Sequence, residues 1–354
     1  MATFRKGEAD KATRDANARE HSRIGGKESS SKIACQYGTA AKSVPPCGTH
    51  LVGSNRVMRS EAIARKPASV WRMALEVMPR RRRPSGRMLI SIGLVAALPF
   101  VFPVMLQRFV DQLLYYPMRY PDGDWSSQQQ AGAEDVWLTS RDGLKLNAWW
   151  FPEPAARYAT LFLHGNAGNV THRVDHALAA KQAGSAMLVL DYRGYGKSEG
   201  RPSERGLYQD ADAGYEELIR RGYPAERIIL HGESLGTAVA TELASRRACA
   251  ALILEAPLAS LSRMAGQVIP IVGPVLARGF DTERRIQAIH VPLLVIHGDA
   301  DEIVPFVQGR AVYQNANEPK SFWRVTGAGH NNLLLVAGSE YPNQLRAFYA
   351  SIGP

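Results

Sequence analysis

The sequence predicts an α/β fold in which a mostly parallel sheet is covered by helices on both faces. Apolar strand-like runs alternate with amphipathic helical runs along residues 159–352, the arrangement that builds a parallel sheet from β-α-β units. An alternating stretch at Glu134–Phe151, with the turn dipeptide Asp142-Gly143 inside it, predicts a leading hairpin. Of the 354 residues 45% are hydrophobic and 21% charged, which excludes disorder of the whole chain.

The remaining elements follow from local pattern, and together they predict one α/β domain over residues 115–354. A stretch with Pro270, Gly273 and Pro274 interrupts the rhythm at residues 258–289, where we expect a small lid beside the site. Strands are predicted at Ala159–Leu163, Ala186–Asp191, Arg227–His231, Ala251–Glu255, Pro292–His297 and Ser321–Val325. Helices are predicted at Val170–Ala183, Ser203–Arg221, Leu235–Arg246, Phe306–Asn315 and Tyr341–Ile352.

The net charge of +10 is confined to the first quarter of the chain. Residues 1–87 hold 19 Lys and Arg against 7 Asp and Glu, whereas residues 88–354 hold 24 against 26. A basic stripe on a folded surface is therefore not predicted, and we expect no nucleic-acid partner. Residues 1–80 read as a disordered basic tail. Alternatively this segment is not part of the natural protein, with the true start at Met73, Met78 or Met88.

Residues 88–106 run for nineteen positions without a charge, close to the length that spans a bilayer. They predict a single transmembrane anchor over residues 88–107. Arginines at 80–83 and 87 precede this run, which favours a cytoplasmic N-terminus and an extracytoplasmic catalytic domain, periplasmic if the cell is bacterial. The alternatives are a cleaved signal peptide, a buried core helix, and an interfacial or re-entrant segment, the last encouraged by Pro99 and Pro103.

A strand, a tight turn and a helix meet at residues 231–236, His-Gly-Glu-Ser-Leu-Gly. A Gly-x-Ser-x-Gly sequence in this setting predicts a nucleophile elbow, with Ser234 as the nucleophile exposed at the carboxyl end of the sheet. The alternative is a serine that merely caps the following helix.

A serine needs a base and a group that orients the base. His330 follows the last predicted strand and is the candidate base, with Asp301 as the carboxylate that orients it. Asp299 and Glu302 are rivals for the acid, and Asp299 alternatively caps the turn. Each of these residues lies in a loop at the carboxyl end of a strand, where open α/β sheets bind ligands.

The candidate oxyanion hole consists of two backbone N–H groups. One belongs to Leu235, directly after the nucleophile, and the other to Asn166 in the glycine-containing loop at residues 164–169. His164 is expected to support that loop rather than to react.

These motifs, HGNAGN, DYRGYGKSEG, HGESLG, HGDADEIVP and GAGHNN, resemble the α/β-hydrolases, in particular the branch related to Bem46 and ABHD13-type proteins. The resemblance covers residues 113–352 and includes the YYP connector after a single anchor. It implies that Ser234 is the nucleophile, Asp301 the acid and His330 the base, and that residues 191–200 form a structural loop near the site.

The leading interpretation is a membrane-anchored serine hydrolase acting on a small-molecule or lipid ester or thioester without a metal or organic cofactor. Cys35, Cys47 and Cys249 show neither disulfide nor metal spacing, and Cys249 reads as a buried apolar residue. A serine aminopeptidase uses the same triad and is the first alternative. A non-enzymatic binding protein on a hydrolase fold is the second.

Overall fold

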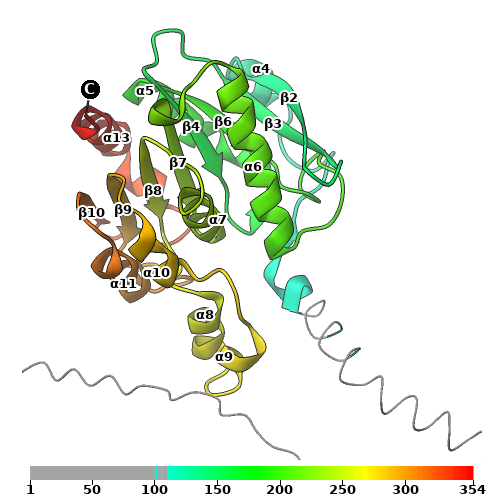
Figure 1. The fold of residues 1–354 in the computed structure, drawn as a ribbon, viewed down its shortest axis with the longest axis vertical. Coiled ribbons are helices and arrows are strands. Elements are labelled where there is room, and N and C mark those ends of the chain that lie inside the picture. Colours follow the sequence, from blue (N-terminus) through cyan, green and yellow to red (C-terminus); the bar gives the residue numbers. More distant parts are fainter. Residues whose placement is uncertain (1–100, 102–104, 106–109, 354) are drawn as a thin grey trace, which may run out of the picture. The chain divides into compact units, whose positions relative to one another are not determined.

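The computed structural model describes Val101, Met105 and residues 110–353 (Figure 1). The predicted tail at residues 1–80 lies outside the described residues, and so does the predicted anchor at 88–107 apart from Val101 and Met105. In the part of the chain that is described, no helix combines the length and the apolar character needed to cross a bilayer. The tail and the anchor stay predictions.

An eight-stranded sheet forms the centre of the domain, in the order β10-β9-β8-β7-β4-β6-β3-β2. β3 runs antiparallel to both of its neighbours, and the other neighbouring pairs are parallel, which confirms the predicted, mostly parallel sheet. The strands of this sheet are β2 (Glu134–Thr139), β3 (Lys145–Phe151), β4 (Tyr158–Leu163), β6 (Ser185–Leu190), β7 (Ile228–Glu233), β8 (Ala251–Glu255), β9 (Leu293–Gly298) and β10 (Lys320–Val325).

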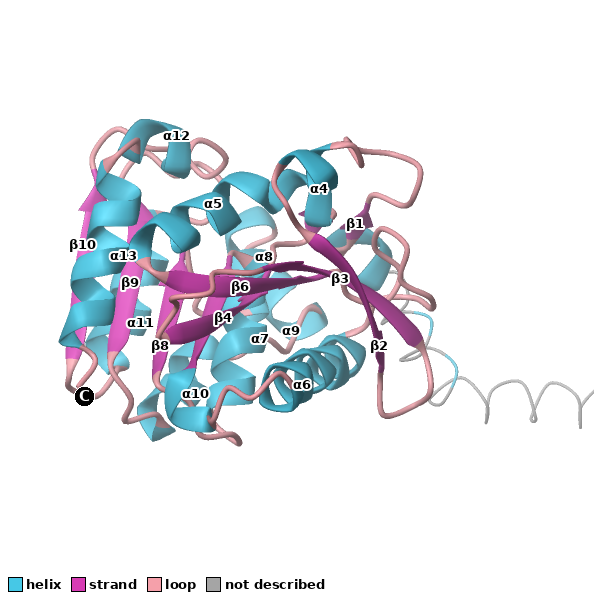
Figure 2. Cartoon of the chain, turned by 90° about the horizontal axis from the view of Figure 1, so that it is seen from above, coloured by secondary structure: helices cyan, strands magenta, loops and turns pink. Residues whose placement is uncertain are grey.

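Helices cover both faces of the sheet, as predicted (Figure 2). Residues of α6, α7 and α11 pack in one apolar cluster, and residues of α5, α12 and α13 pack in clusters on the opposite face. The helices are α4 (Ser127–Gln130), α5 (Val174–Ala183), α6 (Glu204–Arg220), α7 (Leu235–Ala244), α8 (Leu261–Val268), α9 (Gly273–Leu276), α10 (Thr282–Arg285), α11 (Phe306–Asn315), α12 (Leu333–Ala337) and α13 (Glu340–Ser351). Single 3₁₀ turns lie at Val170–Arg173, Ala225–Arg227 and Ile286–Ala288.

Burial explains why these segments become strands. Every residue of β4, β6, β8 and β9 is buried, because helices close off both faces of these central strands. In β2, which lies at the edge, only Val136 and Leu138 are buried, and the exposed residues alternate with them. The buried side chains of the two faces form the core that holds the carboxyl ends of β4, β7, β9 and β10 in fixed positions.

Several short elements were not predicted from the sequence, among them α4 and α12. The segment at residues 258–289, predicted as a small lid, contains the three short helices α8, α9 and α10. In addition, β1 (Tyr116–Pro117) pairs in parallel with β5 (Ala167–Gly168), which ties the start of the described domain to the loop after β4. Each of these elements is only two to eight residues long, which is too short for hydrophobic periodicity to reveal it.

Candidate active site

Ser234 stands at the turn between β7 and α7 with φ 51° and ψ −117°, a conformation that non-glycine residues rarely adopt. Two glycines make the turn possible. A Cβ on Gly232 would lie 2.4 Å from the carbonyl oxygen of Gly236, and a Cβ on Gly236 would lie 1.8 Å from the carbonyl oxygen of Leu163. The Ser234 side chain makes no capping bond to α7. The helix-cap alternative therefore does not describe this serine.

The structure brings Ser234, His330 and Asp301 together from three separate loops. His330 Nε2 lies 3.0 Å from Ser234 Oγ, and His330 Nδ1 lies 2.7 Å from Asp301 Oδ2. The side chains of Asp301 and His330 are 1% and 9% exposed, so the hydrogen bond between them is almost completely shielded from water. Because a carboxylate only accepts, Nδ1 carries the proton, and Nε2 is left to accept from the serine hydroxyl.

The two rival carboxylates have other positions. Asp299 accepts hydrogen bonds from the Gly327 amide at 2.7 Å and from Arg324 Nε at 2.6 Å, so it closes the turn before His330, as the alternative for this residue proposed. Glu302 is exposed and makes no hydrogen bond to His330 in the described part of the chain. Asp301 is thus the acid that faces the histidine.

Asp301 is held as an anion by several donors. Its Oδ1 accepts from the backbone amides of Ile303 at 2.9 Å and Val304 at 2.8 Å. Burial opposes its ionisation, but hydrogen bonds from His297 and His330 outweigh burial and place the pKa of Asp301 below 3.8. Burial also opposes the charged form of His330, and the neighbouring Asp301 carboxylate outweighs it, so the pKa of His330 lies above 6.5.

Of the two predicted oxyanion-hole residues, Leu235 directly follows the serine, and Asn166 follows Gly165 in the loop after β4. Leu235 is the first residue of α7, where backbone N–H groups have no acceptor within the helix. A Cβ on Gly165 would lie 3.3 Å from Ser234 Cβ, which places the loop that carries Asn166 against the nucleophile. The Asn166 carbonyl accepts from Tyr116 N at 2.9 Å and Tyr195 Oη at 2.8 Å, and these bonds fix the orientation of the loop.

A clamp that the sequence analysis missed joins this loop to the elbow. Glu233, directly before the nucleophile, pairs with Arg173 Nε at 2.5 Å and accepts from the Gly165 amide at 3.3 Å. Arg173 also donates to the Ala167 carbonyl at 3.2 Å. Burial opposes the charge of Glu233, and the Arg173 guanidinium lowers the pKa of Glu233 below 4.5. Arg173 and Glu233 are 60 residues apart, so no local pattern in the sequence could have paired them.

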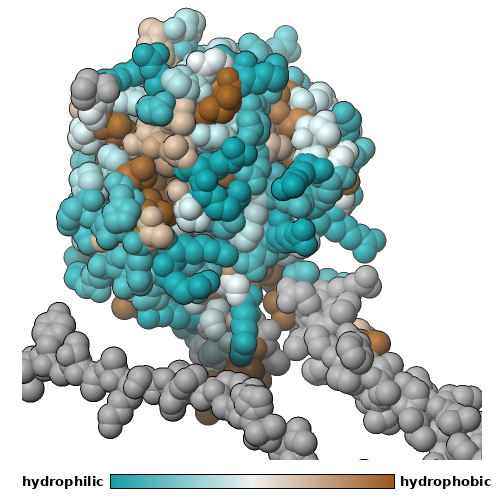
Figure 3. Space-filling model, viewed as in Figure 1, coloured by the Kyte–Doolittle hydropathy of each residue, from teal (hydrophilic) through white to brown (hydrophobic). Residues whose placement is uncertain are grey.

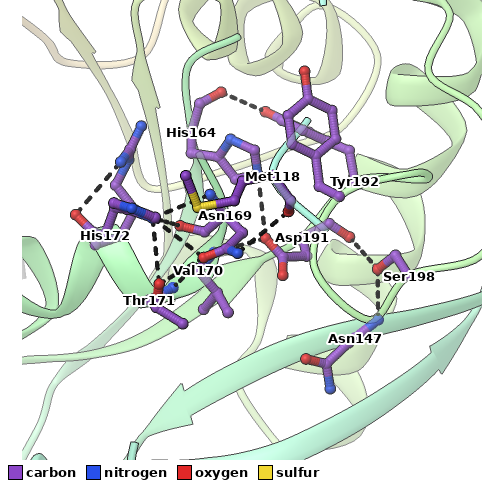
Figure 4. Close-up of polar contacts among 12 residues, drawn as sticks. Met118, Asn147, His164, Asn169, Val170, Thr171, His172, Asp191, Tyr192 and Ser198 are labelled. Atoms are coloured by element: carbon purple, nitrogen blue, oxygen red, sulfur yellow. Dashed lines mark hydrogen bonds and ion pairs between the residues drawn. The ribbon is translucent and has the colours of Figure 1, made fainter. Parts of the chain in front are cut away.

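A buried polar cluster supports the same loop from below (Figure 4). Asp191 accepts from the Val170 amide at 2.7 Å and lies 3.5 Å from His164 Nε2, with both side chains fully buried. The backbone carbonyl of His164 accepts from Tyr192 Oη at 3.2 Å, and Asp191 O accepts from Ser198 Oγ at 2.7 Å. These contacts show that His164 supports the loop structurally and that the segment at 191–200 packs against the loop and holds it in place.

A second buried network lies behind the elbow. Glu255, at the end of β8, accepts from Tyr341 Oη at 2.5 Å and lies 3.3 Å from His176 and 3.5 Å from His231. Its backbone carbonyl accepts from the Ser234 amide at 2.8 Å. Burial disfavours its charge, but the two histidines lower the pKa of Glu255 well below 4.5. The network thus places a carboxylate directly behind the nucleophile's strand.

The described residues hold no group of three or more His, Cys, Asp or Glu side chains that is arranged to bind a metal ion. Cys249 is buried at the start of β8, and burial raises the pKa of its thiol to about 12. It therefore packs as a small apolar residue, and its thiol stays protonated and unreactive.

Comparisons with known proteins agree with this architecture. Residues 154–282 match the family model described as serine aminopeptidase, S33, a range that includes Ser234 but ends before Asp301 and His330. Among solved structures, the esterase Pf2001 of Pyrococcus furiosus superposes with a TM-score of 0.58 at 22% identity, covering 68% of this chain and 99% of that one. A thermophilic esterase of Thermogutta terrifontis gives 0.51 at 19% identity, covering 63% and 100%. At these identities the likeness is one of fold.

Two curated relatives are closer in sequence. An uncharacterized protein of Mycobacterium tuberculosis is 37% identical over 262 residues, which cover 73% of this chain and 92% of the relative. The α/β-hydrolase domain-containing protein 17C of Mus musculus is 36% identical over 231 residues, which cover 64% of this chain and 71% of the relative. The narrower likeness to Bem46 and ABHD13-type proteins stays a prediction. With its fold, its strand–turn–helix elbow and these relatives taken together, the chain belongs to the α/β-hydrolase superfamily.

Proposed function

We propose that this chain is a serine hydrolase that cleaves a carboxylic ester, thioester or lipid acyl bond through an acyl-enzyme. One observation carries the proposal: His330 lies 3.0 Å from Ser234 Oγ on one side and 2.7 Å from Asp301 on the other. A serine becomes nucleophilic when a positioned base takes its proton and a third group orients that base. The esterase neighbours and the hydrolase relatives support the same reaction class.

The proposed cycle uses His330 for every proton. Ser234 Oγ attacks the carbonyl carbon while its proton passes to His330 Nε2, and the backbone amides of Leu235 and Asn166 donate to the oxyanion. As the intermediate collapses, the same nitrogen returns the proton to the departing alcohol or thiol. Water then attacks the acyl-enzyme, His330 accepts one proton from it, and Ser234 takes that proton back as the carboxylic acid leaves.

A fluorophosphonate probe tests the proposal, because it forms a covalent bond only with an activated serine. We expect labelling of the full-length protein and loss of labelling in Ser234→Ala. Ser339→Ala, a change at an exposed serine at the start of α13, is the matched control and should label like the wild type. Absence of labelling in a folded wild type, or equal labelling of Ser234→Ala, would contradict the proposal.

The second candidate is a serine aminopeptidase, which the matched family model favours by its description. Such an enzyme needs a free carboxylate to hold the substrate's ammonium group. In the lid segment at residues 258–289, however, Asp281 caps α10 and pairs with Arg284 at 2.8 Å, and Glu283 pairs with Arg263 at 3.1 Å. We therefore expect turnover of p-nitrophenyl butyrate to exceed that of amino-acid p-nitroanilides. The reverse preference would favour the peptidase.

We also infer a single-pass membrane protein, anchored by residues 88–107, whose catalytic domain lies outside the cytoplasm. The uncharged run at residues 88–106 and the arginines before it support this inference. Protease added to spheroplasts should digest the hydrolase domain of the full-length protein. Protection of the domain until the membrane is permeabilised would place it in the cytoplasm.

A further inference from the structure

Residues 264–277, which we name the lid tip, form an apolar segment between two cationic residues. No charged side chain occurs within these positions, and Arg263 and Arg278 stand directly on either side. The lid tip comprises most of α8, the turn that follows, and α9.

Five apolar side chains of the lid tip are exposed to solvent. Ile271 is 88% exposed and has φ 71°, a conformation that is strained for a β-branched residue. Single exposed apolar residues are normal on a protein surface, but neighbouring ones in this number mark an interaction site. Figure 3 shows apolar atoms at the lower end of the domain, where α8 and α9 lie in Figure 1. The exposed residues are Val268, Ile269, Ile271, Val272 and Val275.

The base of the lid is fastened to the domain, so the exposure does not arise from a loose loop. Gln308 on α11 accepts from the Ala259 amide at 3.0 Å and donates to Met264 Sδ at 3.1 Å. On the other side, Glu204 of α6 accepts from the Phe280 amide at 2.8 Å. Ser262 Oγ donates to the Pro274 carbonyl at 2.7 Å and holds α8 against α9.

The incoming chain reaches the domain near the lid base and the active site. The Asn166 side chain donates to the Leu114 carbonyl at 2.9 Å, so the incoming chain touches the proposed oxyanion loop. Tyr115, the next residue, is buried in the same apolar cluster as Phe280 at the lid base. The uncharged run at residues 88–106 ends only four positions before Val110, the first residue of the continuous described part.

We propose that the lid tip is a membrane-docking surface, and that its occupant is the lipid bilayer in which residues 88–106 are anchored. In the sequence only seven residues, 107–113, separate the uncharged run from Leu114, and this short spacing is the reason for choosing that bilayer as the occupant. The exposed apolar side chains enter the interfacial region of the leaflet, and Arg263 and Arg278 lie at the level of anionic headgroups. This docking depends on the proposed anchor and not on the proposed hydrolysis.

A fluorescent probe at the lid tip tests the docking in the full-length protein. Cys35→Ser and Cys47→Ser remove the other reactive thiols, whereas Cys249 can stay because it is buried and its thiol has a raised pKa. Ile271→Cys is labelled with an environment-sensitive dye and reconstituted into vesicles of phosphatidylcholine and phosphatidylglycerol. Acyl-chain bromination of these lipids should quench the dye at least about twofold, as expected for a side chain within the acyl boundary.

The matched control is Glu226→Cys in the same background, at an exposed position next to the amino end of β7. Its dye should keep a water-like emission and remain unquenched. An unquenched dye at position 271 would overturn the proposal. An apolar, blue-shifted emission that is not quenched in vesicles and disappears in nanodiscs holding one copy each would also overturn it, because the occupant would then be a second copy of the chain.

A second variant separates docking from catalysis. Val268→Asp combined with Ile271→Asp places two charges in the lid tip, which contains none of the proposed catalytic residues. Fluorophosphonate labelling in detergent should remain at the wild-type level, whereas quenching of a dye at Val275→Cys in vesicles should fall to the level of the Glu226→Cys control. Quenching that survives the two aspartates would overturn the docking proposal and leave the proposed hydrolysis untouched.

Discussion

Ser234 occupies a backbone conformation that costs about 1–3 kcal/mol for a residue with a side chain. Its neighbours compensate for this strain. The Ser234 amide donates to the Glu255 carbonyl at 2.8 Å, and the Ser234 carbonyl accepts from Thr237 Oγ1 at 2.5 Å. The strained turn directs the hydroxyl away from the helix and toward His330, which a relaxed helix cap would not do.

Asp301→Asn should lower kcat by roughly 10³- to 10⁴-fold with little change in folding. An asparagine amide at this position donates to His330 Nδ1, so the proton moves to Nε2 and the serine loses its acceptor. Ester turnover and thermal unfolding measured on the same preparation check this. Asp299→Asn is the matched control, and it should retain most of the activity because Asp299 bonds to Gly327 and Arg324 instead.

The same pair predicts the acid limb of the pH profile. Catalysis needs neutral His330, and Asp301 raises the pKa of His330 above 6.5, so kcat/KM should rise with pH at a midpoint above 6.5. Removing the carboxylate charge in Asp301→Asn should move the midpoint of the residual activity to lower pH. A midpoint that is unchanged in the variant would show that Asp301 does not set the pKa of the base.

At this scale the sequence reveals residues that lie in local motifs and hides those that meet across the fold. Ser234 and His330 were predicted because glycines and strand ends surround them in fixed order. The pairing of Arg173 with Glu233 depends on how the loop after β4 folds over the elbow, and nothing in either local sequence carries that information.

At the scale of elements, the elbow depends on the contact between α7 and β4. Gly236→Ala should destabilise the protein by more than about 3 kcal/mol, since the new methyl would meet the backbone of Leu163, which cannot move aside within the central strand. Chemical denaturation measures the loss. Gly222→Ala is the control: its φ is 91° but its surroundings are open, so only about 1 kcal/mol is expected. Equal losses in the two variants would contradict the steric explanation.

Strands and long helices were predictable because their burial leaves a periodic pattern. β8 and α11 coincide with their predicted bounds. α6 begins one residue after its predicted start, because Ser203 caps the helix by accepting from the Gly206 amide. The lid helices were missed because they are only four to eight residues long, which is too short for a helical period to repeat. Gly266, Gly273 and Pro274 also interrupt the pattern in α8 and α9.

At the scale of the whole molecule, the buried carboxylate of Glu255 links the strand beside the nucleophile to the helices α5 and α13. Glu255→Gln should lower the free energy of unfolding by roughly 3 kcal/mol at neutral pH, because Tyr341, His176 and His231 lose a charged acceptor. Glu216→Gln removes an exposed partner of Arg247 and should cost less than about 1 kcal/mol.

The sign of the pH dependence follows from the depressed pKa of Glu255. Its contribution to stability is present above the unfolded value of 4.5 and is lost as the pH falls through the folded pKa. The difference in Tm between wild type and Glu255→Gln should therefore shrink below about pH 4.5. A difference that stays constant down to acid unfolding would show that the charge of Glu255 does not stabilise the fold.

The pairing of β1 with β5 has a mechanical consequence. Two backbone hydrogen bonds, from the Tyr116 amide to the Asn166 carbonyl and from the Met118 amide to the Gly168 carbonyl, attach the start of the domain to the loop after β4. Any pull or tilt applied to residues 110–115 is thus transmitted to the loop that carries Asn166, next to the nucleophile. A shortened version of the domain that starts after Met118 would lose these hydrogen bonds while keeping the eight-stranded sheet. We expect the loop that carries Asn166 to become the first mobile part of that shortened domain.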